Sequence, residues 1–161
     1  SYTGHKDNVW AVAWSPDGLR VASCGDNTVQ VWNAGTGQRL GVFNGHTDNM
    51  RAVAWSPDGR RVASCGDNTV QVWHVDTGQH PVVSYTGHKD NVWAVAWSPD
   101  GRHIASGSGD NTVQVWDAST RQRLVSYTGH TELVYAVAWS PDGQRVASGS
   151  WDNTVQVWQA V

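Results

Sequence analysis

The sequence predicts an all-β fold built from four copies of one unit, and two repeated segments carry this prediction. The heptapeptide DNTVQVW occurs four times in the 161 residues, beginning at positions 26, 67, 110 and 152. The octapeptide AVAWSPDG also occurs four times, beginning at positions 11, 52, 94 and 136. Self-similarity at a fixed period is typical of repeat architectures, so we interpret the whole chain as one repeat array without a linker.

Each copy carries the signals of four short strands. In the first copy, residues 9–14 (VWAVAW) alternate with a period of two. This alternation puts Trp10, Val12 and Trp14 on one face and the small side chains, together with Val9, on the other. Turn residues separate this segment from further strands predicted at 19–23, 28–32 and 39–43. No span has helical periodicity, so each copy is predicted to be a four-stranded antiparallel meander.

Such a sheet has two apolar faces and cannot bury either of them alone. The Trp-Val-Trp face is bulky and the alanine face is flat, so stacking the bulky face of one sheet on the flat face of the next buries both. Radial repetition of four-stranded sheets is the architecture of a β-propeller, which is therefore the predicted fold.

Four recurring features resemble those of WD40-repeat proteins: the Gly-His start, the SPDG turn, the Asp turn and the closing Val-Trp. The closing Trp-Asp of that family occurs once here, as Trp116-Asp117, and Asn33, His74 and Gln159 replace its Asp in the other copies. The resemblance implies one propeller domain over residues 1–161. Its repeats are expected at about 4–44, 45–86, 87–128 and 129–161, with Ser1, Tyr2 and Thr3 as a closing strand.

The resemblance also implies a hydrogen-bonded tetrad of His, Ser, Asp and Trp in every repeat. The implied sets are His5, Ser23, Asp26 and Trp32; His46, Ser64, Asp67 and Trp73; His88, Ser106, Asp110 and Trp116; and His130, Ser148, Asp152 and Trp158. Ser108 and Ser150 are alternatives to Ser106 and Ser148. A Ser, a His and an Asp could instead form a hydrolase triad, but one nucleophile repeated in every copy is a poor way to build one active site. We therefore expect a structural role and no enzyme activity.

Composition argues against several further classes of function. Eleven basic and 14 acidic residues give a net charge of −3, which does not favour nucleic-acid binding. No apolar run is long enough for a membrane span, and no leader peptide is recognised. We expect no metal site and no cofactor, with His74, His80 and His103 exposed to solvent. Cys24 and Cys65 occupy equivalent positions and are expected to be free thiols, which favours a cytoplasmic location.

One set of positions varies while its neighbours repeat. The resemblance places these positions on one open face of the disc, where partners of such propellers often dock. An aromatic and arginine cluster is typical of an interaction hot spot, for a protein, a peptide or a glycan. Alternatively, the rings cover the outer end of the interblade core. The candidate residues are Trp10, Arg51, Trp93, Tyr135 and Trp151.

Four repeats are few for a closed ring. Closure with four blades needs about 90° between neighbours and closure with eight needs about 45°, and the interblade side chains are ordinary in size. We therefore expect half of an eight-bladed ring, completed by a second copy in a two-fold homodimer acting as a self-assembling scaffold. Residues 4–18 match residues 87–101 letter for letter. Copies this similar are typical of recent amplification, as in a highly repetitive bacterial array, or of an engineered or excised propeller fragment.

Overall fold

The computed structural model describes residues 1–77 and 81–161, and these form fifteen strands in four antiparallel sheets. Each sheet is called a blade. Blade 1 contains β1 (Val9–Trp14), β2 (Arg20–Gly25), β3 (Thr28–Asn33) and β4 (Arg39–Asn44). Blade 2 contains β5 (Ala52–Trp55), β6 (Arg61–Cys65), β7 (Val70–His74) and β8 (Val83–Tyr85). Blade 3 contains β9 (Val92–Trp97), β10 (His103–Ser108), β11 (Val113–Asp117) and β12 (Arg123–Tyr127). Blade 4 contains β13 (Val134–Trp139), β14 (Arg145–Ser150) and β15 (Val155–Gln159).

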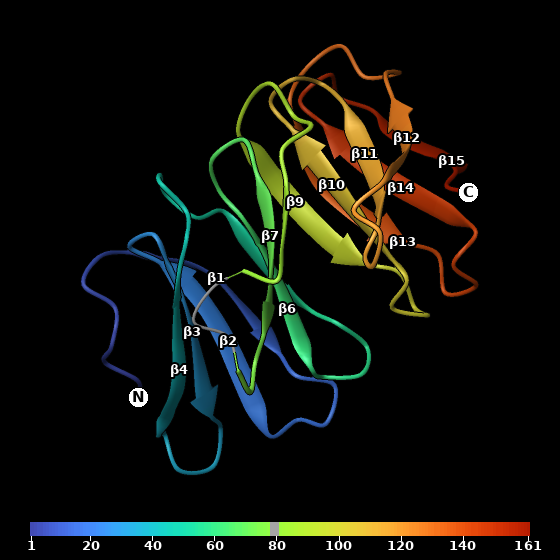
Figure 1. The fold of residues 1–161 in the computed structure, drawn as a ribbon. Helices are drawn as coiled ribbons and strands as arrows, with labels where there is room; N and C mark the ends of the chain where they lie inside the picture. The colour runs from blue at the N-terminus through green and yellow to red at the C-terminus, as the bar shows by residue number, and fades with distance from the viewer. Residues whose placement is uncertain (78–80) are drawn as a thin grey trace.

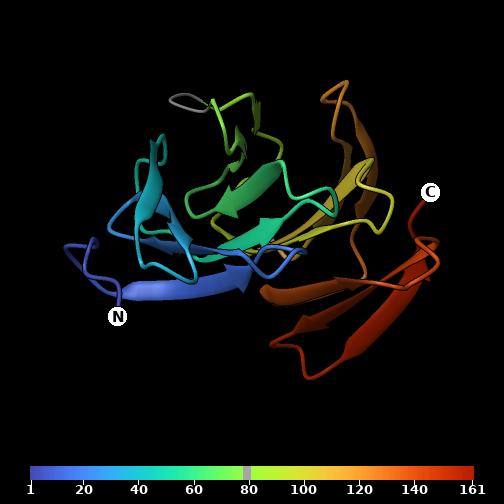
Figure 2. The ribbon, with the colours of Figure 1, turned by 90° about the horizontal axis from the view of Figure 1, so that it is seen from below.

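No helix occurs among the described residues, and hence none that could cross a membrane. In every blade the strands follow one another in sequence order across the sheet, as in a meander. The first strands β1, β5, β9 and β13 lie next to one another and form the inner side of an open arc. Blades 1 and 4 stand at opposite ends of this arc (Figures 1 and 2).

The fourth sheet differs from the prediction of four four-stranded blades, because it contains three strands in the part of the chain that the structure describes. Ser1, Tyr2 and Thr3 form no strand and lie beside blade 1. Within this chain they therefore do not pair with β15, and no other described strand pairs with the outer edge of β15.

The predicted alternation along β1 is wrong at its start. A β-bulge between Val9 and Ala11 shifts the register of β1 against β2. A bulge inserts one extra residue and re-aims its neighbours, so Val9 lies with Val12 and Trp14 on the bulky face. Trp10 instead turns toward Arg51 of the next blade. β13 has the same bulge between Val134 and Ala136.

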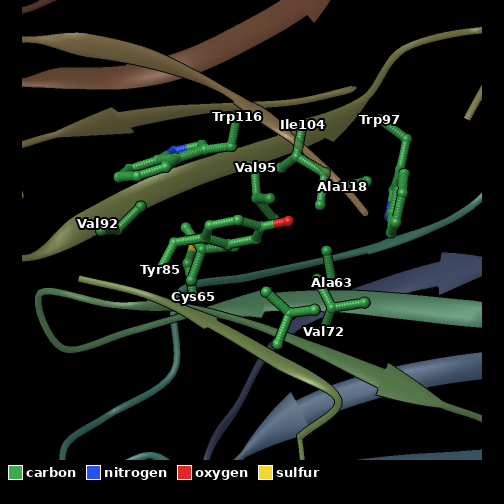
Figure 3. Packing of buried hydrophobic residues seen from close by; sticks show 12 residues of the cluster. Ala63, Cys65, Val72, Tyr85, Val92, Val95, Trp97, Ile104, Trp116 and Ala118 are labelled. Carbon is green, nitrogen blue, oxygen red and sulfur yellow. The ribbon is translucent and has the colours of Figure 1, made fainter. Parts of the chain in front are cut away.

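Three hydrophobic cores lie between successive blades, and each joins the bulky face of one blade to the flat face of the blade before it. Between blades 2 and 3, Val92, Val95 and Trp97 of β9 pack against Ala52 and Ala54 of β5. Figure 3 shows this core from close by, with Trp97 on the side of Ala63 and Val72 of blade 2 and the Trp116 ring over the ring of Tyr85. The cores between blades 1 and 2 and between blades 3 and 4 repeat this pairing.

Two faces remain uncovered because the arc is open: the bulky face of blade 1 and the flat face of blade 4. On the bulky face, Trp14 is 65% exposed, whereas its equivalents Trp55 and Trp97 are each 8% exposed inside the cores. On the flat face, Val157 is 60% exposed, whereas its equivalent Val115 is fully buried. The chain therefore displays one unpaired half of its interblade core at each end.

Candidate functional site

Blade 2 illustrates how the His, Ser, Asp and Trp side chains of one repeat come together. His46, in the loop before β5, places its Nε2 2.9 Å from the Ser64 Oγ and its Nδ1 3.3 Å from an Asp67 carboxylate oxygen. Trp73 on β7 donates from its Nε1 to the Ser64 Oγ over 2.8 Å. The network joins the entry loop, the second and third strands and the turn between them.

Blades 1 and 3 contain the same network, and the structure distinguishes between the alternative serines. In blade 3, His88 Nε2 lies 2.8 Å from the Ser106 Oγ, while Ser108 donates to the backbone carbonyl of Asp90. Ser106 therefore belongs to the network and Ser108 fastens the entry loop. The complete sets are His5, Ser23, Asp26 and Trp32 in blade 1, and His88, Ser106, Asp110 and Trp116 in blade 3.

Blade 4 has an incomplete network. His130 lies 2.7 Å from both the Ser148 hydroxyl and an Asp152 carboxylate oxygen. Ser150 instead donates to the backbone carbonyl of Glu132. The buried Nε1 of Trp158 has no hydrogen-bond partner, and its ring stacks on Tyr127 with centroids 4.9 Å apart. In this blade the indole therefore does not donate to the serine.

In each blade the Ser, His and Asp side chains are hydrogen-bonded in the same sequence as in a hydrolase triad. Unlike in such a triad, the serine hydroxyl is not accessible to a substrate. A nucleophilic serine must reach a substrate carbonyl. Ser64 is fully buried, and its Oγ already accepts a hydrogen bond from the Trp73 indole. What the arrangement can do is satisfy several buried polar groups at once, which holds the strands of a blade in one register.

The network also sets the acidity of its carboxyl groups. Burial is the largest single influence on the pKa of Asp67 and acts to raise it. Hydrogen bonds from His46, Thr69 and the backbone N–H of Thr47 together outweigh burial. They hold the pKa of Asp67 well below its usual range, and the pKa of Asp110 is lowered in the same way.

Three of the five candidate interaction residues meet at one edge of the arc, the edge at which the first strands begin. We call it the upper edge. The Arg51 guanidinium carbon lies 4.3 Å from the ring centroid of Trp93 and 5.6 Å from that of Trp10. The cation is therefore held between two indoles that come from the blades on either side, and we call this group the indole clamp.

Tyr135 and Trp151 lie on the same edge without joining the clamp. Val134 pairs with Ser150, which puts the start of β13 beside the β14–β15 turn that carries Trp151. The Trp151 backbone N–H donates to the carbonyl of Leu133 over 3.0 Å. The rings of Tyr135 and Trp151 are 52% and 63% exposed, so they add apolar surface to the upper edge.

Sequence reasoning missed a second set of contacts, which fastens each blade to the next. The Nε1 of Trp55 donates to the Ala13 carbonyl over 3.0 Å. Arg20 stacks on Trp55, with 4.9 Å from guanidinium carbon to centroid, and donates to the Gly59 carbonyl over 2.8 Å. Equivalent contacts recur farther along the arc: Trp97 to Ala54, Trp139 to Ala96, and Arg61 to Trp97 and Gly101. The signal available in the sequence was the recurring Arg or His that begins the second strand.

The remaining histidines and the two cysteines are the other side chains that could serve metal or thiol chemistry. No group of three or more His, Cys, Asp and Glu side chains there could hold a metal ion. His74 and His103 are partly buried rather than exposed, since His103 stacks on Trp139; His80 lies outside the described residues. Cys24 and Cys65 are free and buried, and burial raises the pKa of the Cys24 thiol to about 12.

The repeats can now be compared with known proteins. The family model of the WD domain, G-beta repeat (WD40) matches residues 1–33, 37–74, 79–117 and 121–159. The last three matches each run from the fourth strand of one blade to the third strand of the next. Because the matches span most of its residues, the chain belongs to the WD40-repeat family.

Curated relatives resemble only a short part of the chain. A segment of 31 residues is 61% identical to a probable cytosolic iron-sulfur protein assembly protein CIAO1 homolog of Nematostella vectensis. A segment of 32 residues is 59% identical to the corresponding protein of Chlamydomonas reinhardtii. Each match covers 19% of this chain and 10% or 9% of the relative, which is less than one full repeat.

Proposed function

We propose that the chain is a non-catalytic, self-assembling WD40 scaffold in which two copies join head to tail to close one eight-bladed ring. One observation carries this proposal: the two uncovered faces are the two halves of an interface that the chain already makes three times internally. The tetrads act as structural networks in it, and no cofactor is required. WD40 propellers are in general protein-interaction modules, which supports the non-catalytic class.

The uncovered bulky face presents the side chains that fill each interblade core. Val9, Val12 and Trp14 line an apolar hollow together with Tyr2 and Trp32. Their equivalents in blade 3, Val92, Val95 and Trp97, are all buried against blade 2. A large exposed apolar patch of this kind marks an association site.

The uncovered flat face presents the complementary surface. Ala136, Ala138, Ala147 and Val155 line a shallow apolar depression on blade 4. They are equivalent to Ala52, Ala54, Ala63 and Val70, which receive the bulky face of blade 3. The flat face of one copy therefore fits the bulky face of another. A contact between two different faces of identical chains closes into a ring when the rotation allows it.

We call the proposed contact between the flat face of one copy and the bulky face of another the joint. The internal contacts predict which atoms would meet there. By equivalence with Trp55 and Ala13, the Trp14 Nε1 would donate to the Ala138 carbonyl of the second copy. By equivalence with Arg20, Arg145 would stack on Trp14 of the second copy and donate to its Gly18 carbonyl. Trp14 and Arg145 are both exposed within one chain, so both side chains are available for the joint.

The mass in solution tests this proposal. We expect sedimentation equilibrium to give twice the 17.5 kDa mass of one chain at micromolar concentration. A stable species with the mass of one chain would contradict the self-assembly. An open series of larger oligomers would support the face pairing but contradict closure with eight blades.

Residues 1–3 are proposed to close the joint as an added strand. The ring of Tyr2 stacks on Trp32 at 5.2 Å, and its hydroxyl donates to the Ala34 carbonyl. Tyr85 at the end of β8 likewise packs on a tryptophan of the next blade, Trp116, and pairs with Val70 in the ladder. Its hydroxyl donates to the Asp117 carbonyl, one position earlier than the counterpart of Ala34. The shared packing of Tyr2 and Tyr85 on a tryptophan supports the proposal that residues 1–3 act as the fourth strand of a preceding blade. In the ring Tyr2 would pair with Val155 of the second copy.

Deleting residues 1–3 is expected to weaken the homodimer about tenfold, because an aromatic contact and part of one strand pairing are lost. Sedimentation velocity over a dilution series measures the change. The Tyr2→Phe variant is the matched control, since it keeps the ring and loses only the hydroxyl. An unchanged dissociation constant after the deletion would contradict the closing strand.

A second candidate function is recognition of a peptide or glycan at the upper edge, which the exposed rings of Trp10, Tyr135 and Trp151 favour.

We also propose a reducing, cytoplasmic location. Two buried free thiols support it, and so does the word cytosolic in the names of the relatives. No role in nucleic-acid or membrane binding is proposed. That the near-identical copies arose by amplification or by design stays a prediction.

A further inference from the structure

We propose that Arg51, held in the indole clamp, binds a carboxylate group of a peptide at the upper edge. The site lies within one chain, because Trp10, Arg51 and Trp93 come from blades 1, 2 and 3. It therefore does not depend on ring closure, and its test can fail or succeed independently of the mass measurement.

Arg51 differs from the other stacked arginines in having no acceptor. Arg20 and Arg61 also lie over indole rings, but each donates to a glycine carbonyl of the next blade. The Arg51 side chain takes part in none of the hydrogen bonds or ion pairs among the described residues, and its Nε is buried without a partner. The clamp thus fixes a cation whose donors remain unused.

The geometry of the clamp selects the shape of the ligand. Because two indoles lie against the guanidinium and its Nε is buried, a ligand must approach the terminal N–H groups. These groups form a planar fork that matches the two oxygens of a carboxylate. Trp10 is 50% exposed, so it can also contact the apolar part of the residue that carries the carboxylate.

The surrounding charges favour a singly charged ligand over a phosphate. In the three loops that precede the members of the clamp, Asp7, Asp48 and Asp90 outnumber Lys6 and Lys89, so these loops carry a net negative charge. Carboxylates at these positions repel a doubly charged anion more strongly than a singly charged one. A peptide carboxylate is therefore the ligand that we infer.

Titrations followed by the indole and Arg Nε–H signals in nuclear magnetic resonance spectra test this inference. The probes are an end-blocked tripeptide with a central glutamate, its glutamine counterpart, an uncharged tripeptide with a free C-terminal carboxylate, and inorganic phosphate. We expect saturable shifts of the Arg51, Trp10 and Trp93 signals with the glutamate peptide and none with the glutamine peptide. A stronger response to the free C-terminus would support the same site and identify a chain end as the carboxylate source.

Three variants complete the experiment. Arg51→Gln is expected to weaken binding at least tenfold. Arg51→Lys keeps the charge but loses the fork, so it should also bind more weakly while its thermal unfolding is unchanged. Arg123→Gln, at an exposed position on β12, should bind as the parent does. Equal binding of the glutamine peptide, tighter binding of phosphate, or unchanged binding by Arg51→Gln would overturn the proposal.

Discussion

Replacing Trp14 with glutamate is expected to convert the homodimer into a folded monomer. In the proposed ring, the indole of Trp14 fills the joint as Trp55 and Trp97 fill the internal cores. Removing a tryptophan from the centre of an interface typically costs about 2–4 kcal/mol, which is roughly 30- to 1,000-fold in the dissociation constant. The charge of glutamate would add an unpaired buried carboxylate. Sedimentation velocity measures the mass, and circular dichroism checks that the β-structure remains.

Two further variants make this experiment specific. Trp151→Ala removes an indole of similar exposure from the upper edge and should leave the dimer intact. Ala138→Glu should break the joint from the flat side. Because the joint pairs unlike faces, a mixture of Trp14→Glu and Ala138→Glu chains restores one intact joint and should form a dimer with one joint open. Dimers in Trp14→Glu alone, or no association in the mixture, would argue against head-to-tail pairing.

Replacing Asp67 with asparagine is expected to destabilise the fold by about 1–3 kcal/mol at neutral pH, as for a buried charged hydrogen-bonding group that loses its partners. The pKa of Asp67 is lower in the folded state than the usual value of about 3.9. The carboxylate therefore contributes stability above about pH 4, and this contribution is lost as the pH falls below that value. The difference in the free energy of unfolding between parent and variant should accordingly be largest at about pH 7 and shrink toward about pH 3.

Urea unfolding across this pH range, at one protein concentration, measures the difference. Asp76→Asn is the matched control, because its side chain is 75% exposed and lies 3.9 Å from Arg20 in a weak surface pair. That variant should differ from the parent by less than about 0.5 kcal/mol at every pH. A pH-independent effect of Asp67→Asn would mean that the network does not hold the carboxylate in its charged form.

The repeat period allowed most of the fold to be predicted, because each strand is signalled locally by alternation and by turn residues. The family resemblance named side chains that are hydrogen-bonded to one another in blades 1 to 3, whereas in blade 4 the Trp158 indole has no hydrogen-bond partner. The choice between Ser106 and Ser108 needed the tertiary contacts of His88. The bulge in β1 could not be read from alternation, so Val9 and Trp10 were assigned to the wrong faces. His74 and His103 were predicted to be exposed but are partly buried. His103 stacks on Trp139 of the next blade, a contact that the sequence pattern does not reveal.

By itself the sequence determined the four-fold repeat, the antiparallel blades and the side chains that fill the cores, since these follow from local patterns copied four times. Only the tertiary structure decided that Arg51 lies between two indoles and that Trp14 and Val157 stay exposed. Equivalent residues in different repeats have different surroundings, because the first and last blades of the arc each lack a neighbouring blade on one side. The physical reason is that burial depends on which blade stands next, which no single repeat encodes.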